Sequence, residues 1–365
     1  MGWTSNPRPA GILKNNTSPP MLKKHLYAIA CCIALTAAHG CQEKQEENSW
    51  QTSAMPIRCN VSSVDDMNSN RSLIETNDQL NQIGLTKGEA IALWGDFTFN
   101  GEVHHDFINT PLTCTAAENN TWNYHDYTRY WRDHAQYKFR AFFPMNAIGD
   151  KAQAADAESL NIDYDTETLQ EDLLVAYREI DTDSWNQQRA VPLEMQHALA
   201  TLKFVFKMEE ASKRTNSLTS LHLDKQLKTA GQLVYNTTQV TVESWQNLKT
   251  SDASQLYAWA NSGVSFSATT QATAYTTPQG TTTTTGAEYC VSNGHLFIIP
   301  QECAVAPTLS LSTPTKEYDV SLGTTRFQPG KQYIYTLTVR DDDELHITLK
   351  IKKWNELDSS YDITF

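Results

Sequence analysis

The chain has 365 residues, which is too long for a single small module and sufficient for two domains of ordinary size. Hydrophobic residues make up 40% and charged residues 19% of the sequence, so Thr, Ser, Asn and Gln are abundant, a composition that favours extended, exposed strands. The 29 basic and 42 acidic residues give a net charge of −13 without a basic cluster, which argues against binding of nucleic acid through a basic face.

The first 40 residues resemble a bacterial export signal. Residues 21–25 (MLKKH) are basic, and residues 26–38 form an apolar run that is shorter than the roughly 20 residues needed to span a bilayer. The sequence AHGC that ends at Cys41 is similar to a lipoprotein signal, which predicts that Cys41 becomes the acylated N-terminus. An ordinary signal peptide or a short anchor helix is the alternative. Residues 1–20 resemble no export element, which favours Met21 over Met1 as the start.

Removal of residues 1–40 leaves 325 residues with 25 basic and 42 acidic side chains, a net charge of −17. Residues 41–55 begin with a polar, acidic stretch that has nothing to pack, and we expect them to form a tether. Four cysteines remain when Cys31 and Cys32 leave with the signal and Cys41 is acylated, namely Cys59, Cys114, Cys290 and Cys303. Three pairings are possible, and a disulfide between Cys290 and Cys303 across a hairpin is one prediction. No closely spaced pair of cysteines suggests zinc.

Apolar residues alternate with polar ones along much of the chain, which predicts half-buried strands at residues 137–143, 202–208, 333–339 and 345–351. The last two predict a hairpin through the acidic turn at residues 340–344. Residues 169–180 carry apolar side chains at spacings of three and four, which predicts one short helix. Polar residues at 209–217 mark a domain boundary, and the Thr-rich residues 267–287 predict a surface loop or an edge hairpin.

Residues that could support catalysis or bind a metal are few. His104 and His105 precede Asp106, but neighbouring side chains on a strand point to opposite faces, so one metal ion would not take both histidines easily. His197 lies at the entrance to an alternating strand, where a structural histidine is expected. We therefore expect no enzymatic activity, no metal and no cofactor. The acidic turn at residues 340–344 lacks the spacing of a calcium loop, and a solvated turn explains its charges.

Six aromatic residues lie between positions 122 and 137. Such rings either stack on sugars and protein partners or fill the space between two sheets. We favour packing, because sandwiches without Leu-rich helices need bulky core residues.

Several segments, in order, resemble those of the fimbrillin-like (Mfa-like) pilus subunits of Bacteroidetes-type bacteria. They are WNY at 122–124, YW at 130–131, YKFRAFFP at 137–144, DLLVA at 172–176, VPLEMQHALATL at 191–202, FIIPQ at 297–301 and FQPGKQY at 327–333. Arg132 stands where the family has a proline, and each segment alone is weak. Together, behind a lipoprotein signal, they cover almost the whole mature chain.

The resemblance implies a mainly β fold of two tandem transthyretin-like antiparallel β-sandwich domains, at residues 56–209 and 210–365, with one short helix in the first. It also implies a structural and adhesive subunit of a fimbria on the outer membrane and cell surface, held there by a lipid anchor. Its partners would be other pilus subunits and a trypsin-like processing protease. The alternative is a non-polymerising surface lipoprotein that binds glycans or host protein through Trp122, Tyr124, Tyr127 and Trp131.

In this family the first strand of the subunit plugs an apolar groove until cleavage after an arginine releases it, and a neighbour's C-terminal strand replaces it. Carried over to this sequence, the plug strand would contain Ile57, Cys59, Val61 and Val64. The cut would fall between Arg71 and Ser72. The donor strand would contain Tyr361, Ile363 and Phe365, which alternate along the last five residues.

Overall fold

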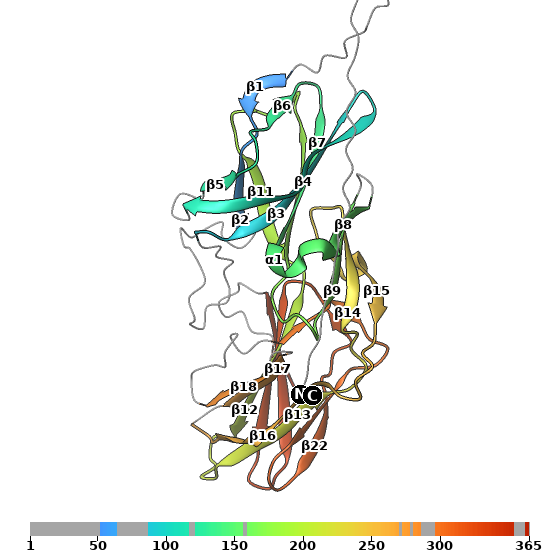
Figure 1. Ribbon diagram of the computed structural model, residues 1–365. Helices are drawn as coiled ribbons and strands as arrows, with labels where there is room; N and C mark the ends of the chain where they lie inside the picture. The colour runs from blue at the N-terminus through green and yellow to red at the C-terminus, as the bar shows by residue number, and fades with distance from the viewer. Residues whose placement is uncertain are drawn as a thin grey trace, which may run out of the picture. The chain divides into compact units, whose positions relative to one another are not determined.

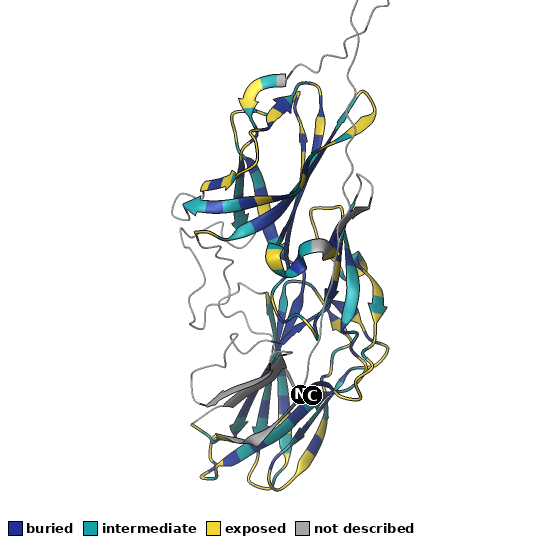
Figure 2. Cartoon of the chain, in the orientation of Figure 1, coloured by how far each residue is buried: buried dark blue, intermediate teal, exposed yellow. Residues whose placement is uncertain are grey.

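The structure, a computed structural model, describes residues 52–63, 87–116, 121–155, 159–269, 272–277, 280–285, 296–353 and 362–364 (Figure 1). Its regular structure is almost entirely β, so the expected mainly β fold is confirmed. The described helices are short, and none has the length and apolar character needed to cross a membrane. Figure 2 shows how buried and exposed residues are distributed along the strands.

The N-terminal part is one seven-stranded sheet with the order β2-β11-β10-β7-β3-β4-β5. Its strands are β2 (Cys59–Ser63), β3 (Ala90–Phe99), β4 (Glu102–Ala116), β5 (Thr121–Tyr124), β7 (Gln136–Phe143), β10 (Leu174–Asp181) and β11 (Val191–His197). The two edge strands, β2 and β5, contact each other, so the sheet curls around its core. That core includes Leu93, Phe107, Trp131 and Phe139, all completely buried. β1 (Thr52–Pro56) pairs separately with β6 (Tyr130–Arg132).

The C-terminal part is a sandwich of two sheets around a second core. The larger sheet has the order β18-β17-β12-β24-β25-β26, and β19 also pairs with β12. Its strands are β12 (Ala200–Met208), β17 (Ala272–Thr277), β18 (Gly280–Thr285), β19 (Leu296–Ile298), β24 (Lys331–Val339), β25 (Leu345–Lys353) and β26 (Asp362–Thr364). The smaller sheet contains β16 (Leu256–Phe266), β13 (Asn216–Leu223), β21 (Thr308–Ser312) and β22 (Glu317–Ser321).

A third core lies under a separate four-stranded sheet with the order β15-β14-β9-β8. Its strands are β8 (Ala152–Ala155), β9 (Ser159–Asp165), β14 (Ala230–Tyr235) and β15 (Trp245–Lys249). The helix α1 (Met145–Ile148) and the short 3-10 turns Gly149–Lys151 and Val242–Ser244 adjoin these strands. A two-stranded ribbon of β20 (Gln301–Glu302) and β23 (Arg326–Phe327) completes the regular structure of the described residues.

Strand partners change at Ala198 and Leu199, between β11 and β12. This point lies upstream of the boundary expected at residues 209 and 210, because β12 pairs along its length with β24 in the C-terminal sheet. Both linking residues are completely buried. The Ala198 carbonyl accepts a hydrogen bond from Trp245 Nε1 at 3.0 Å, and the Leu199 carbonyl accepts one from the Gly330 amide at 2.8 Å. The link is therefore packed and bonded.

The helix predicted at residues 169–180 is wrong. Residues 174–181 are strand β10, which pairs with β7 from Leu174↔Phe143 to Asp181↔Gln136. Leu174, Val175 and Ala176 are all buried because β10 has neighbours on both sides and cores on both faces. A strand buried on both faces loses the alternation that identifies it, and its apolar run imitates helical spacing. The helix of the N-terminal part is α1, at Met145–Ile148.

Candidate functional site

The strongest candidate for a functional site is the groove that β2 occupies at the edge of the N-terminal sheet. β2 runs parallel to β11, from Cys59↔Val191 to Ser63↔Met195. β2 lies at the sheet edge and pairs with β11 alone, so its main chain forms few hydrogen bonds to the rest of the domain. Its side chains therefore contribute more than its main chain to holding it in place.

Three side chains of this segment enter the N-terminal core. Ile57, Cys59 and Val61 are 1%, 5% and 7% exposed, and all three belong to the cluster that contains Trp131 and Phe139. Their alternate spacing is that of a strand with one buried face. Burial of each such side chain stabilises the fold by about 1.5–3 kcal/mol for Ile or Val and less for Cys. Without β2, the core would be open to water along these three sockets.

The entrance of the groove holds both backbone groups of Ile57. The Ile57 amide donates to the Arg129 carbonyl at 2.8 Å, and Tyr124 Oη donates to the Ile57 carbonyl at 2.8 Å. On the other side of the segment, the Val191 amide donates to the Arg58 carbonyl at 2.7 Å. The segment is thus held from two directions where it passes from β1 to β2.

Arg129 is anchored by charge and by aromatic rings. Its Nη1 and Nη2 donate to the two carboxylate oxygens of Asp126 at 2.6 and 2.5 Å, and its Nε donates to the Asp106 carbonyl at 2.5 Å. The guanidinium lies 4.3 Å from the centre of the Phe107 ring and 4.2 Å from that of Tyr127. Hydrogen bonds from Arg129 lower the pKa of Asp126 below its usual 3.8, so the pair stays charged at neutral pH.

Burial raises the pKa of the Tyr124 phenol, and the nearby Cys59 raises it further, against opposing contributions from Arg129. The hydroxyl therefore keeps its proton and can donate it to the Ile57 carbonyl. Its ring is held at 85° to the Phe107 ring, with the centroids 5.4 Å apart. The entrance consequently offers Ile57 one donor, the Tyr124 hydroxyl, and one acceptor, the Arg129 carbonyl.

The predicted aromatic cluster lies largely inside the core. Trp131 is completely buried and Trp122 is 8% exposed, whereas Tyr127, at 63%, and Tyr130, at 41%, are exposed to solvent. Trp131 packs edge-to-face on Tyr137 and Phe139, with centroids 5.0 and 6.0 Å away. The packing interpretation is therefore confirmed.

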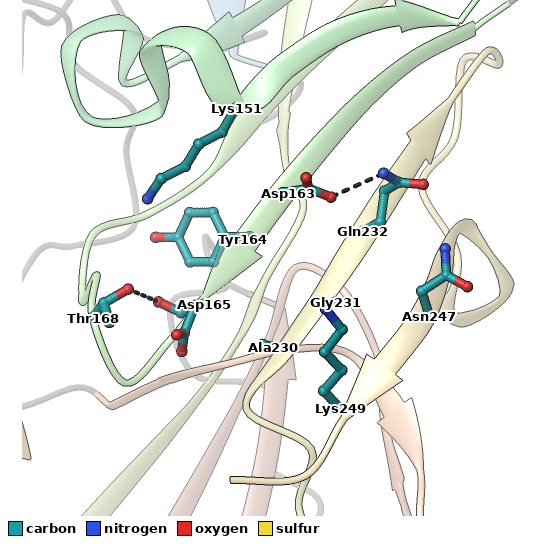
Figure 3. Close-up of a pocket in the computed structure, with 10 residues that line it drawn as sticks. All are labelled: Lys151, Asp163, Tyr164, Asp165, Thr168, Ala230, Gly231, Gln232, Asn247 and Lys249. Carbon is teal, nitrogen blue, oxygen red and sulfur yellow. Dashed lines mark hydrogen bonds between the residues drawn. The ribbon is translucent and has the colours of Figure 1, made fainter.

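A second concave region lies on β9, β14 and β15 and encloses about 740 Å³ (Figure 3). Gln232 Nε2 donates to Asp163 Oδ1 at 2.9 Å across the two central strands. Lys151 and Lys249 lie on opposite sides of the pocket, and Gly231 leaves its floor without a side chain (Figure 3). The Tyr164 hydroxyl belongs to the framework, because it donates to the Glu171 carbonyl at 2.5 Å. The pocket is an open surface depression.

The histidines singled out in the sequence have structural partners. His197 Nδ1 lies 2.5 Å from Asp172 Oδ2, and His105 Nδ1 lies 2.5 Å from Asp96 Oδ1. Asp96 also forms a buried ion pair with Arg140 at 2.6 Å. Within the part of the chain that the structure describes, His, Cys, Asp and Glu side chains form no group of three suited to a metal ion.

A family model described as fimbrillin-like matches residues 76–354. The chain belongs to the fimbrillin-like family. No curated protein matches it. A putative cell adhesion protein from Bacteroides uniformis is 13% identical over 82% of this chain and 99% of its own, with a TM-score of 0.48. One from Bacteroides ovatus is 13% identical over 84% and 99%, with a TM-score of 0.49. The tip fimbrial protein Mfa3 from Porphyromonas gingivalis is 10% identical over 76% and 96%, with a TM-score of 0.36.

Several predicted site residues of this fimbrillin-like chain lie outside the described residues: Cys41, Val64, Arg71, Ser72, Cys290, Tyr361 and Phe365. Of the residues predicted for a plug strand, Ile57, Cys59 and Val61 are described and belong to the same buried cluster. Of the residues predicted for a donor strand, Ile363 is described at the backbone level. It lies in β26, opposite Leu349 at the edge of the C-terminal sheet. Cys303 is buried, and its disulfide with Cys290, which lies outside the described residues, stays a prediction.

The sequence does not indicate the entrance positions of Tyr124 and Arg129. Tyr124 is named there only in the glycan-binding alternative, and the hydrogen bonds of both residues come from the structure. The Asp126-Arg129 spacing of three residues was the available signal, but such pairs are common in surface turns.

Proposed function

We propose that the chain is a structural and adhesive subunit of a cell-surface fimbria that assembles by strand exchange. The subunit is exported as a lipoprotein anchored to the outer membrane through Cys41. A trypsin-like protease cuts after Arg71, which frees the segment containing β2. The C-terminal strand of a neighbouring subunit then enters the groove, so that successive subunits are joined by β-augmentation.

The position of β2 is the observation that carries this proposal. β2 is an edge strand with a single ladder, yet Ile57, Cys59 and Val61 complete an otherwise continuous core. Such a strand combines limited main-chain attachment with a groove that requires an apolar occupant. Residues 64–89, which contain Arg71, connect it to β3. A cut in this connection breaks the covalent link between β2 and the domain that holds it, and it leaves both β2 and β3 intact.

The C-terminus has the pattern of a replacement strand. Tyr361, Ile363 and Phe365 alternate with the same spacing as Ile57, Cys59 and Val61. Ile363 meets the middle socket whichever way the incoming strand runs. It offers that socket more apolar surface than Cys59, and each additional buried methylene stabilises by about 0.8 kcal/mol. β26 already pairs with β25 at the edge of the C-terminal sheet, over the three residue pairs from Thr348↔Thr364 to Lys350↔Asp362.

The glycan-binding alternative is not favoured, because burial of Trp122 and Trp131 leaves Tyr127 as the exposed ring of the four residues on which it depended.

The test uses Arg71→Ala in cells, with polymer ladders on unboiled gels as the measurement. We expect the variant to remain a lipidated monomer, because its plug strand stays covalently linked. Arg58→Ala is the matched control, since Arg58 is an exposed arginine of the same segment and should leave the ladder unchanged. N-terminal sequencing of the assembled wild-type protein should begin at Ser72. Normal ladders from Arg71→Ala would overturn the processing step.

A second arm of the same experiment deletes residues 361–365. We expect monomers that are cut normally but fail to extend, because the donor strand is missing. Asp362→Ala, which changes a residue out of phase with Ile363, is the control and should polymerise. A full ladder from the truncated chain would reject the donor role.

A further inference from the structure

The pocket on β9, β14 and β15 lies on strands that take no part in the proposed strand exchange. The groove is formed at β2 and β11 of the N-terminal sheet, whereas these three strands belong to the separate sheet β15-β14-β9-β8. The pocket volume of about 740 Å³ is within the range of roughly 300–1,000 Å³ that is usual for ligand sites. Side chains from the turn Gly149–Lys151 and from the three strands line it (Figure 3). The pocket therefore has the size of a binding site.

A β-bulge in β15 adds one side chain to the pocket. One residue of β14, Gly231, faces two residues of β15, Asn247 and Leu248. Asn247 has a φ of 52°, in the left-handed region that Asn adopts more readily than most residues other than Gly. A Cβ on Gly231 would lie 2.7 Å from Leu248 Cδ2, so the glycine leaves room for Leu248 to pack against the third core. Asn247 is thereby placed on the pocket side, as bulges re-aim side chains elsewhere.

Two lysines supply positive charge to the pocket. Lys151 and Lys249 are exposed and lie on its opposite sides (Figure 3). Within the described ranges, neither ammonium group forms an ion pair. An anion that enters the pocket therefore displaces only water from these lysines. Because the two charges are on opposite sides, they favour a ligand with two separate anionic groups over one compact ion.

The remaining polar groups of the pocket both donate and accept hydrogen bonds. Asp163 accepts from Gln232 Nε2 at 2.9 Å, which orients that amide, and Asp165 and Asn247 also line the pocket. A sulfate ion has no proton for these two carboxylates and is repelled by their charge. A sugar hydroxyl can donate to a carboxylate and accept from a side-chain amide. The set of groups therefore fits a polyhydroxylated ligand that carries its own carboxylates.

We propose that this pocket binds an acidic glycan, an oligosaccharide whose sugar units carry carboxylates. Lys151 and Lys249 each pair with one ligand carboxylate. Asn247, Gln232 and Asp163 bind the hydroxyls between them. The inference goes beyond strand exchange and does not depend on it, and it gives the adhesive role of the subunit a class of ligand.

The first test measures binding by the full, uncut chain. A microarray presents oligosaccharides of galacturonate and of sialic acid, each beside its uncharged methyl ester, and isothermal titration calorimetry then measures the affinity for the strongest binder. We expect the acid to bind at least about tenfold more tightly than its ester, because the ester keeps the hydroxyls but loses its charge-assisted hydrogen bonds. Sulfate at equal concentration should not displace the glycan. Absence of binding to every acidic glycan, equal binding of the esters, or displacement by sulfate would overturn the proposal.

Substitutions then locate the binding site. Lys151→Gln and Lys249→Gln should each lower the affinity about tenfold, the effect of losing a hydrogen bond to a charged group. Asn247→Gly should lower it about fivefold while the fold is retained, since Gly adopts positive φ without strain. Lys228→Gln is the control and should bind normally, because Lys228 donates to Thr250 Oγ1 at 2.9 Å and does not line the pocket.

Unchanged affinity in both Lys151→Gln and Lys249→Gln would place the glycan elsewhere and overturn the site. Circular dichroism of each variant verifies that it is folded. Because the chain is uncut and monomeric, the result is independent of cleavage at Arg71 and of polymerisation.

Discussion

Aromatic residues a few positions apart in the sequence serve different purposes, as Trp131 and Tyr127 show. Trp131 is completely buried, and its Nε1 donates to the Gln187 carbonyl at 3.2 Å, whereas Tyr127 is 63% exposed. Composition indicated an aromatic cluster but not which rings face inward, because residues 121–135 form only the short strands β5 and β6, with too few residues for an alternating pattern. Packing was the better interpretation, and the rings act mainly as core.

This assignment predicts a large difference in stability between two aromatic substitutions. Trp131→Ala should destabilise the fold by about 3–5 kcal/mol, because it opens a cavity beside Tyr137 and Phe139. Tyr127→Ala should cost about 1 kcal/mol or less, since it removes mainly a contact with the Arg129 guanidinium. Urea unfolding followed by tryptophan-independent circular dichroism measures both. Similar losses in the two variants would contradict the assignment.

Among the elements, strands whose apolar residues alternate in the sequence were predictable, and a strand with a continuous apolar run was not. β7, β12, β24 and β25 are strands as expected, although β7 and β12 are buried on both faces, and the turn at residues 340–344 joins the last two as predicted. The hairpin of β17 and β18 falls in the Thr-rich segment. β10 was mistaken for a helix, since its burial depends on β7 and β11, which are distant in sequence.

Because Cys59 is buried with β2, the reactivity of its thiol would report release of this strand. Burial raises the pKa of the Cys59 thiol from 9.0 to about 12, which lowers the thiolate fraction at pH 8 about a thousandfold. We therefore expect negligible maleimide labelling in the intact chain and rapid labelling once a cut and a competing donor peptide release β2.

Cys303 provides an internal control for this experiment. Burial also raises the pKa of its thiol, to about 11, but it belongs to the C-terminal core. It should stay unlabelled in both states, and mass spectrometry distinguishes the two sites. Protection of Cys59 that persists while donor peptide is bound would contradict release of the strand.

At the scale of the whole molecule, the residues that the structure describes form three cores where the sequence suggested two. The third forms because β14 pairs with β9, at registers such as Leu233↔Ile162, across a long stretch of chain. No local pattern encodes such a pairing. The same is true of Gln170, which donates to the Phe297 carbonyl at 2.9 Å and accepts from the Phe297 amide at 2.8 Å.

Gln170 is predicted to couple the third core to β19. Gln170→Ala leaves a buried amide and carbonyl of Phe297 without this partner, which should destabilise the fold by about 1–3 kcal/mol. Gln232→Ala, which removes an exposed bond to Asp163, should cost less than about 0.5 kcal/mol. Differential scanning calorimetry measures both. Equal melting temperatures for the two variants would show that the buried amide does not couple these parts.

The passage of the chain from β11 into β12 has a mechanical consequence. β2 lies parallel to β11, and only Ala198 and Leu199 separate β11 from β12. If the chain is pulled at its N-terminal side of β2 and in the opposite direction after β11, the two parallel strands slide along each other. The hydrogen bonds between them would then carry the load together instead of breaking one at a time. β12 lies parallel to β24 in the same way, and it would deliver that load to the interior of the C-terminal sheet. Tension along the chain is thus met by shear at both ladders.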